Sequence, residues 1–313
     1  MKIINLVEDT QGKNEKVKSE HGLCFYVETD SHKILVDTGM SDLAVENALA
    51  LHIDLSEVDT IIITHGHNDH GGGLKYALKA SPDAKVYIQK NAFSKRISLN
   101  HEEPRDISLD SKLKKNKQVV LVEGDYTIDE ELALLQCNSS DFPVPSGNAK
   151  LKIEEDGAYR DDDFTDEMYL RVKAEEKEIL FVGCSHRGIL NIMDSYRKKY
   201  GHDPDLVIGG FHMKHSGEYT DKEIAHMQDT AKVLSHYQSR YETCHCTGEG
   251  PYEVMKMILK DDIGYIHAGE AVNLNRETKK AKGANTYMKM HRFFAWATVF
   301  SFALTMLTGY KRK

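Results

Sequence analysis

Cysteine and positive charge are both in short supply in this chain. Its 313 residues include five cysteines, and only Cys244 and Cys246 stand close together. So few cysteines do not form a disulfide framework, and we therefore expect a reducing, cytoplasmic environment. Acidic residues outnumber basic ones and give a net charge of −8. Because nucleic-acid binding needs a basic face, this charge argues against nucleic acid as a partner.

Signals for secretion and for internal repetition are also missing. Residues 1–9 become polar too early for a signal peptide, and they predict a first strand instead. No tandem repeat is visible, and no linker divides the first 274 residues. We therefore expect one main domain over residues 1–274, a polar tether over residues 275–290 and an apolar helix over residues 291–313.

The end of the chain carries an apolar stretch. Residues 293–310 contain no charged side chain, and Lys289, Arg292 and residues 311–313 flank them with basic groups. A membrane-spanning helix needs about 20 mostly apolar residues, with a range of roughly 17 to 25. The stretch therefore predicts a transmembrane anchor. The alternative is a terminal helix that packs on the body of the protein or in a dimer interface.

The main domain alternates strand-like and helix-like segments. Residues 23–27 and 33–36 flank a turn-like segment and predict a hairpin, and the β-branched run at residues 60–63 predicts a strand buried on both faces. Further strands are predicted near residues 241–245 and from residue 265 to residue 274. Strands alternating with helices predict sheets covered by helices, which is an α/β fold, or α+β in some schemes.

Four side chains that bind metals follow the predicted strand at residues 60–63. They are His65, His67, Asp69 and His70, and imidazole and carboxylate are ligands of zinc and related divalent ions. Gly66 and residues 71–73 are glycines, which free the backbone for conformations that a Cβ forbids. A polar loop with chance histidines is the alternative, but this density directly after a buried strand favours a metal site.

The order His65-x-His67-x-Asp69-His70 resembles the signature of the metallo-β-lactamase superfamily. The segments GCSHRG (residues 183–188), GGFH (209–212) and HCTG (245–248) are similar to a subgroup of metal-dependent hydrolases within it. That subgroup often carries the label dihydropterin–ribofuranosylaminobenzene-phosphate synthase. The resemblance covers about residues 1–274 and implies an αββα sandwich, with the metal site along the edge where the two sheets meet.

The resemblance implies a site for two divalent metal ions, with zinc foremost and manganese or iron as alternatives. Cys184 stands where many relatives have the bridging aspartate, so that carboxylate is missing here. Either Cys184 binds metal as a thiolate or His186 supplies the later imidazole, and we favour His186. The expected ligands are His65, His67, Asp69, His70, His186 and His245, with Cys184 as the alternative. Asp69 is also expected to orient the nucleophile, and His212 to contact the substrate.

Several other side chains receive a structural interpretation. Asp37 ends a predicted strand, and we expect it to hydrogen-bond the metal loop. If residues 241–245 are extended, strand alternation places Cys244 and Cys246 on the face opposite His245, where they pack in the core. His267 remains an outside candidate for a ligand. His215 and His226 are expected on the surface or in loops.

These observations predict a metal-dependent hydrolase that uses a metal-activated water on a phosphoester, an ester or a lactone. One alternative is a synthase that joins a pterin to a ribofuranosylaminobenzene phosphate. The other is a non-catalytic, membrane-tethered metal-binding protein. We expect a small-molecule substrate, a homodimer, and a cytoplasmic body anchored to the membrane through residues 293–310.

Overall fold

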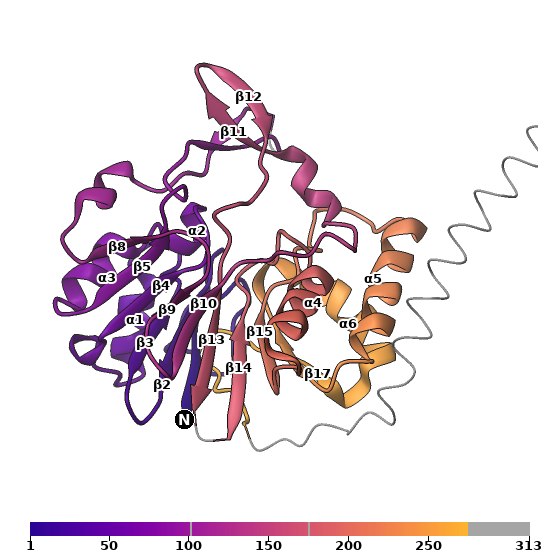
Figure 1. Cartoon of the computed structure of the whole chain (residues 1–313). Helices are drawn as coiled ribbons and strands as arrows, with labels where there is room; N and C mark the ends of the chain where they lie inside the picture. The colour runs from indigo at the N-terminus through magenta and orange to yellow at the C-terminus, as the bar shows by residue number, and fades with distance from the viewer. Residues whose placement is uncertain (101, 175, 275–313) are drawn as a thin grey trace, which may run out of the picture.

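Two β-sheets face each other, and helices cover their outer sides (Figure 1). The structure is a computed structural model that describes residues 1–100, 102–174 and 176–274. The first sheet mixes antiparallel pairing among its first three strands with parallel pairing among the rest. In spatial order its strands are β1 (Lys2–Val7), β2 (Cys24–Glu28), β3 (Lys33–Val36), β4 (Thr60–Ile63), β5 (Lys85–Gln89) and β8 (Val119–Val122).

The second sheet joins a parallel half to an antiparallel half at β14. In spatial order its strands are β17 (Ile263–Tyr265), β16 (Arg240–Thr243), β15 (Leu206–Gly209), β14 (Lys177–Phe181), β13 (Tyr169–Ala174), β10 (Leu132–Leu135) and β9 (Tyr126–Thr127). A small third sheet projects above the sandwich in Figure 1. Its strands are β12 (Ala158–Asp161), β11 (Leu151–Glu155), β6 (Arg96–Ser98) and β7 (Arg105–Asp106).

The helices divide between the two outer faces. Helices α1 (Leu43–Ala50) and α3 (Leu74–Ala80) pack on the first sheet, with the short α2 (Asn68–Gly71) between β4 and α3. Three helices pack on the second sheet, and they are α4 (Ile189–Tyr200), α5 (Asp221–Leu234) and α6 (Glu249–Leu259). Short 3-10 helices are η1 (Leu55–Glu57), η2 (Ser111–Lys115), η3 (Ser146–Lys150), η4 (His245–Thr247) and η5 (Lys260–Asp262). This αββα arrangement confirms the predicted fold class.

Strand β4 shows why the sequence folds into layers. Ile62 points into the core between the two sheets, whereas Ile61 and Ile63 point into the core under α1 and α3. All three side chains are fully buried, and each burial stabilises the fold by roughly 1.5–3 kcal/mol. The prediction of a strand buried on both faces is therefore confirmed.

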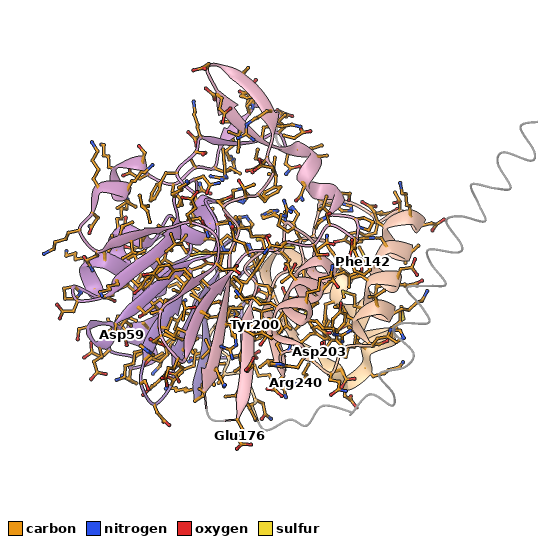
Figure 2. All side chains as sticks on the ribbon, viewed as in Figure 1. Asp59, Phe142, Glu176, Tyr200, Asp203 and Arg240 are labelled. Carbon is orange, nitrogen blue, oxygen red and sulfur yellow. The ribbon has the colours of Figure 1, made fainter. Side chains whose placement is uncertain are left out.

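The parallel strands of the two sheets run toward the same edge of the sandwich. They are β3, β4, β5 and β8 in the first sheet and β14, β15, β16 and β17 in the second. Asp59 and Arg240 stand at the amino-terminal starts of β4 and β16, and both lie in the lower part of Figure 2. The loops that follow β4 and β16 therefore emerge at the opposite edge. This topology brings residues that are nearly 180 positions apart to one place, and it sets the position of the candidate site.

The predicted last strand, from residue 265 to residue 274, is wrong. Strand β17 ends at Tyr265, and the chain then crosses back to the first sheet. There Glu270 O accepts the N–H of Asn5 (2.9 Å) and Val272 donates its N–H to Ile3 O (3.0 Å). These few bonds close the sandwich beside β1 without building a regular ladder.

The prediction of a membrane anchor also requires correction. Within residues 1–100, 102–174 and 176–274, no helix is both long and apolar enough to cross a bilayer. The predicted tether (275–290) and apolar helix (291–313) lie outside the residues that the structure describes. The transmembrane assignment rested on composition and flanking charge alone, and we withdraw it.

Candidate metal centre

The loop after β4 is held in place by carboxylates on both of its sides. Thr64 donates its backbone N–H (2.8 Å) and its hydroxyl (2.8 Å) to Asp37, which follows β3. Gly66 donates its N–H to Asp166 Oδ2 (2.7 Å), and a Cβ on Gly66 would lie 2.0 Å from Ala92 O. Gly66 does not have a left-handed backbone. The expected reason for this glycine is therefore wrong, because Gly66 provides space rather than conformational freedom.

Three histidines form one cluster, which we call the imidazole cluster: His65, His67 and His186. The ring centroids of His65 and His67 are 4.5 Å apart, and the His186 ring lies 4.9 Å from each of them. All three are buried, and one nitrogen from each lies within 4.8 Å of the others. His186 comes from the loop between β14 and α4, so the second sheet supplies it to a loop of the first.

A second cluster, which we call the mixed cluster, adjoins the first and contains Asp69, His70, Cys184 and His245. His70 Nε2 lies 3.0 Å from Cys184 Sγ and 3.8 Å from Asp69 Oδ2. His245 Nε2 lies 3.4 Å from the same Asp69 oxygen. Asp69 is the partly exposed member, and the others are buried. Every residue predicted as a ligand is therefore brought into one of the two adjoining clusters.

Carboxylates orient the histidines of the mixed cluster. His70 Nδ1 lies 2.6 Å from Asp37 Oδ2, and His245 Nδ1 lies 2.6 Å from Asp9 Oδ1. Because a carboxylate only accepts, each ring donates its Nδ1–H to the carboxylate, and this hydrogen bond fixes the orientation of the ring. The prediction that Asp37 hydrogen-bonds the metal loop is confirmed. Asp9 orients the His245 ring in the same way, and it lies after β1 as Asp37 lies after β3.

Neutral groups orient His186 in the imidazole cluster. Its Nδ1 lies 3.0 Å from Asn148 Oδ1, and the same amide donates to the His186 carbonyl at 2.8 Å. Phe164 stacks on the ring, with centroids 4.2 Å apart and planes 5° from parallel. The Glu167 carboxylate accepts the backbone N–H of His186 (2.6 Å) and that of Arg187 (2.9 Å). The result is a ring whose Nε2 faces the cluster.

The two clusters differ in the direction of their pKa shifts. Burial lowers the pKa values of His65, His67 and His186 well below the usual range, and neighbouring imidazoles add to this effect. Burial also acts on His70 and His245, but the aspartates beside them outweigh it and raise the pKa of both. The imidazole cluster is therefore a neutral set of donors, and the mixed cluster is an ionic one.

His212 and Cys246 complete the surroundings of the clusters. The half-buried His212 ring lies 4.2 Å from the His186 ring, and its backbone N–H points at Cys246 Sγ (3.3 Å). The expectation that Cys246 faces away from His245 is wrong. Strand β16 ends at Thr243, and His245 begins a 3-10 helix with φ of 49°, so strand alternation does not apply. Cys244 does pack in the core between the sheets, as expected.

Left-handed backbone conformations gather at this site. Asp37, Ser185, His212 and His245 have φ values between 49° and 59° without being glycine. Such conformations cost of order 1–3 kcal/mol each, and they persist where the surrounding structure holds them. Each of these residues directly follows or lies near the end of a strand, so the strain is concentrated where the chain turns to present side chains to the site.

The sequence did not predict some of the residues that lie at the site. The exposed His21 lies 3.2 Å from Asp9 Oδ2 and 3.4 Å from Asp69 Oδ2. Asp9, His21 and His245 also form a group whose ligand atoms lie within 4.8 Å of one another. An acidic residue after a predicted strand was a usable signal for Asp9. No comparable signal marked His21 or Asn148, because both stand in irregular segments.

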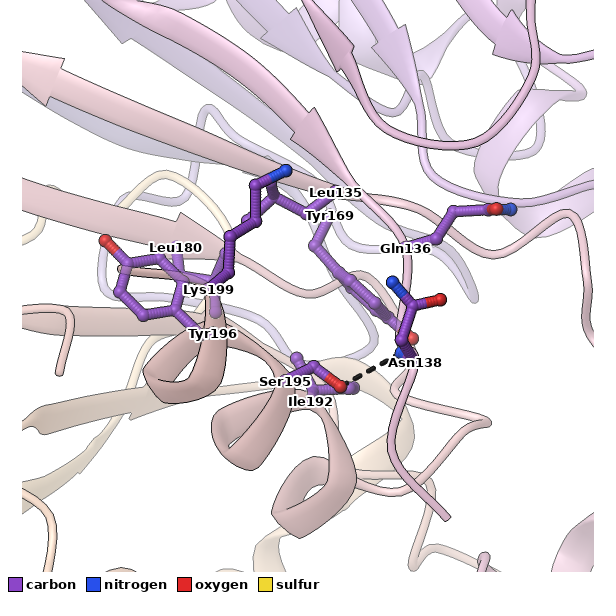
Figure 3. A pocket seen from close by; sticks show the side chains of 9 residues that line it. All are labelled: Leu135, Gln136, Asn138, Tyr169, Leu180, Ile192, Ser195, Tyr196 and Lys199. Atoms are coloured by element: carbon purple, nitrogen blue, oxygen red, sulfur yellow. Dashed lines mark hydrogen bonds between the residues drawn. The ribbon is translucent and has the colours of Figure 1, made fainter. Parts of the chain in front are cut away.

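The remaining histidine candidates lie elsewhere. The exposed His215 lies 3.1 Å from Glu223, and His226 is half-buried on α5. His267 contacts Thr10 and lies 3.8 Å from Glu8 Oε1. A small pocket between α4 and the second sheet (Figure 3) is also separate from the histidines. Its lining consists of Leu135, Gln136, Asn138, Tyr169, Leu180, Ile192, Ser195, Tyr196 and Lys199.

The donor set fits divalent cations. His67 Nε2 and His186 Nε2 are buried and have no hydrogen-bond partner among the described residues. A buried polar atom without a partner costs about 1–3 kcal/mol, and here two such atoms belong to rings of the imidazole cluster. Neutral imidazoles together with carboxylate and thiol groups are the ligands that zinc and similar ions prefer.

Comparisons with known proteins agree with this geometry. Residues 19–132 match the family model of the metallo-β-lactamase superfamily. A solved structure, described as Tm1679, a metal-dependent hydrolase of the β-lactamase superfamily, has 31% identity and a TM-score of 0.74. It covers 88% of this chain and 100% of its own.

Two proteins of Methanocaldococcus jannaschii are also similar over nearly their whole length. One is named 7,8-dihydropterin-6-methyl-4-(beta-D-ribofuranosyl)-aminobenzene-5'-phosphate synthase, with 28% identity over 87% of this chain and 96% of its own. The other is an uncharacterised protein with 27% identity over 86% of this chain and 98% of its own. Taken together with the fold and the histidine loop, these similarities show that the chain belongs to the metallo-β-lactamase superfamily.

Proposed function

We propose that this protein is a hydrolase that depends on two divalent metal ions, with zinc as the foremost candidate. The observation that carries the proposal is the pair of buried, unpartnered Nε2 atoms of His67 and His186, directly beside a second cluster of donors. A fold that keeps such atoms buried loses stability unless something binds them. The superfamily membership supports the same conclusion.

The two clusters would hold the two ions. His65, His67 and His186 would hold the first, and Asp69, His70 and His245 the second. When bound, such ions produce a nucleophile from water near neutral pH and polarise the carbonyl or phosphoryl oxygen under attack. A separate serine or cysteine nucleophile is then unnecessary.

The protein's own contribution is to fix the donors before any ion arrives. Asp37 and Asp9 hold the rings of His70 and His245 through their Nδ1 atoms, and Asn148 holds His186. Each ring therefore presents Nε2 without further reorientation. This preorganisation avoids the entropic cost of ordering long, mobile side chains when the site is loaded.

Asp69 and His212 would act on the reacting groups. The Asp69 carboxylate lies between His70 and His245 and is partly exposed, so it can accept a hydrogen bond from an attacking water. Burial alone would raise the pKa of Asp69, but the His70 and His245 rings hold it well below the usual range. The half-buried His212 ring adjoins His186 and is placed to contact a substrate oxygen.

The substrate class that suits these groups is a phosphoester, an ester or a lactone. To test the proposal, purified protein is freed of metal, reloaded with zinc, manganese or iron, and assayed on a panel of phosphodiesters, phosphomonoesters, esters and lactones. We expect uptake of about two ions per chain and turnover on one substrate group, with loss of turnover in Asp69→Asn. No uptake of metal on reconstitution would overturn the proposal.

A second candidate is a synthase that joins a pterin to a ribofuranosylaminobenzene phosphate. Its support is the similarity to the archaeal protein with that name, which extends over most of both chains. The metal-loaded protein is therefore also incubated with a dihydropterin and a ribofuranosylaminobenzene phosphate, and the mixture is analysed by mass spectrometry. A condensed product without turnover on the hydrolysis panel would favour the synthase.

A further inference from the structure

Cys184 occupies a central position between the two clusters. Its Sγ lies 3.0 Å from His70 Nε2. The same sulfur lies within 4.8 Å of ligand atoms in three groups: one with His65 and His70, one with His186 and His212, and one with His245 and Cys246. The side chain is 2% exposed. A donor in this place can reach either metal position, so Cys184 stands where a bridging ligand would stand.

Cys246 directs a second sulfur to the same space. A Cβ on Gly210 would lie 2.3 Å from Cys246 Sγ, so the absence of a side chain at position 210 makes room for this sulfur. The backbone N–H of His212 donates to the sulfur at 3.3 Å. The sulfur is also 3.5 Å from the carbonyl of Cys184. These contacts fix the sulfur beside His245 rather than in the apolar core.

Cys244 shows that this placement is specific. It stands two positions before Cys246 and is also fully buried, but it packs among the apolar side chains between the two sheets. The 3-10 turn at residues 245–247 changes the direction of the chain between these two cysteines. One sulfur therefore belongs to the core, and the other belongs to the mixed cluster.

We propose that Cys184 and Cys246 act together as thiolate ligands at the metal position of His70 and His245. The inference rests on the proposed function, because it requires that the site binds metal. Thiolates are soft donors, and they select zinc, cobalt or cadmium over manganese and magnesium. They also supply the negative charge that the missing bridging aspartate would have supplied. Each neutral thiol that binds an ion gives up its proton to solvent.

The test adds Co²⁺ to metal-free protein and records its absorption spectrum. A thiolate-to-cobalt charge-transfer band in the near ultraviolet is expected for the unaltered protein. Cys184→Ser and Cys246→Ser should each weaken the band, and the double variant should abolish it. Cys137→Ser is the matched control, because its sulfur contacts Ser139 O and Ser195 Oγ, which suit a hydroxyl. This control should keep the full band.

Metal selectivity provides a second measurement. The preference for Cd²⁺ over Mn²⁺, measured as a ratio of Kd values, should fall at least roughly 10- to 100-fold in the double serine variant, as for other altered metal surroundings. Cys184→Asp supplies a carboxylate at the central position, and it should keep metal uptake while weakening the band and the selectivity. Its uptake also shows that the altered site still folds.

The outcomes separate the two proposals. Full metal uptake without a charge-transfer band in the unaltered protein would overturn the thiolate inference and leave the proposed metal dependence standing. A band that persists in the double serine variant would also overturn the inference, since the sulfur would then come from another cysteine. Failure of the unaltered protein to bind any metal would overturn both.

Discussion

The imidazole cluster and the mixed cluster share one site but are built on different principles. His186 in the first is oriented by an amide oxygen and by an aromatic ring. His70 and His245 in the second are oriented by carboxylates at 2.6 Å. The histidines of both clusters are buried to a similar degree, yet their pKa values move in opposite directions. The difference shows that the partner of each ring, and not burial alone, decides its charge.

The difference in charge between the two clusters would affect a metal ion bound at each of them. A neutral set of three imidazoles adds no negative charge, so an ion bound there would keep its positive charge toward a substrate. The mixed cluster, with Asp69 and the flanking aspartates, would offset part of the charge of an ion bound there. If the proposed function holds, the first position would suit the polarisation of a substrate oxygen, and the second would suit holding and orienting the attacking group.

Removing one donor from each cluster should have the largest effect. We expect His67→Ala to empty the imidazole cluster, Asp69→Ala to weaken the mixed cluster, and the double variant to retain almost no metal. Elemental analysis of the purified variants measures this. His52→Ala with Asp54→Ala is the matched control, because it has the same residue types and spacing in an exposed segment. A double variant with its full metal complement would show that the loop is not the site.

The second-largest effect concerns Cys184 and His186, which stand in the same loop but belong to different clusters. We expect His186→Ala to lower zinc content and turnover more than Cys184→Ala does. The loss of His186 leaves only two protein ligands in the imidazole cluster, whereas the mixed cluster without Cys184 keeps Asp69, His70 and His245. Zinc content and initial rates are measured for both. A larger loss in Cys184→Ala would place the stronger metal bond at the sulfur.

A smaller effect should follow from altering a supporting carboxylate. Asp37→Asn keeps the shape but lets the amide present an N–H to His70, so the ring can no longer be held by an ionic acceptor. We expect metal affinity to fall roughly 10- to 100-fold, measured by competition with a chelator. Asp59→Asn is the control, because Asp59 pairs with His32 (2.8 Å). Equal losses in both variants would mean a general loss of stability.

The smallest effect is expected away from both clusters, at Glu178 near the start of β14. Burial alone would raise its pKa, but Arg171, Tyr196 and His202 lower it to about 2. A lowered carboxyl pKa stabilises the fold above its ordinary value of 4.5, and this stabilisation is lost as the pH falls toward 2. Glu178→Gln should therefore lower the Tm by a few degrees at pH 7.

Thermal unfolding of both proteins from pH 7 down to pH 2 tests this prediction. The difference in Tm between Glu178→Gln and the unaltered protein should shrink as the pH approaches 2, because both side chains are then neutral. A difference that stays constant over this range would assign the effect to packing rather than to charge. Metal binding should be unchanged, since Glu178 lies near the amino-terminal start of β14, whereas Cys184 and His186 follow its carboxyl end.

Much of the site could be predicted because its first part is continuous in sequence. The run at residues 60–63 forms a strand, and the loop at residues 65–70 follows it. Both can be predicted from the pattern of residues within this short segment. The role of Asp37 could also be predicted, because an acidic residue at the end of a strand marks the edge of a sheet. His186 and His245 required the resemblance to a family, since nothing in their own surroundings distinguishes them from other histidines.

The amino-acid sequence by itself determined the layered α/β fold and the dense ligand loop, because hydrophobic periodicity and local ligand spacing act over a few residues. Only the tertiary structure decided which distant groups join that loop. Asp9, His21 and Asn148 reach the site because both sheets end at one edge. Cys246 faces the ligands because a 3-10 turn replaces the expected strand at His245. The reason is that side-chain direction depends on backbone dihedral angles, which are set by packing among strands far apart in the sequence.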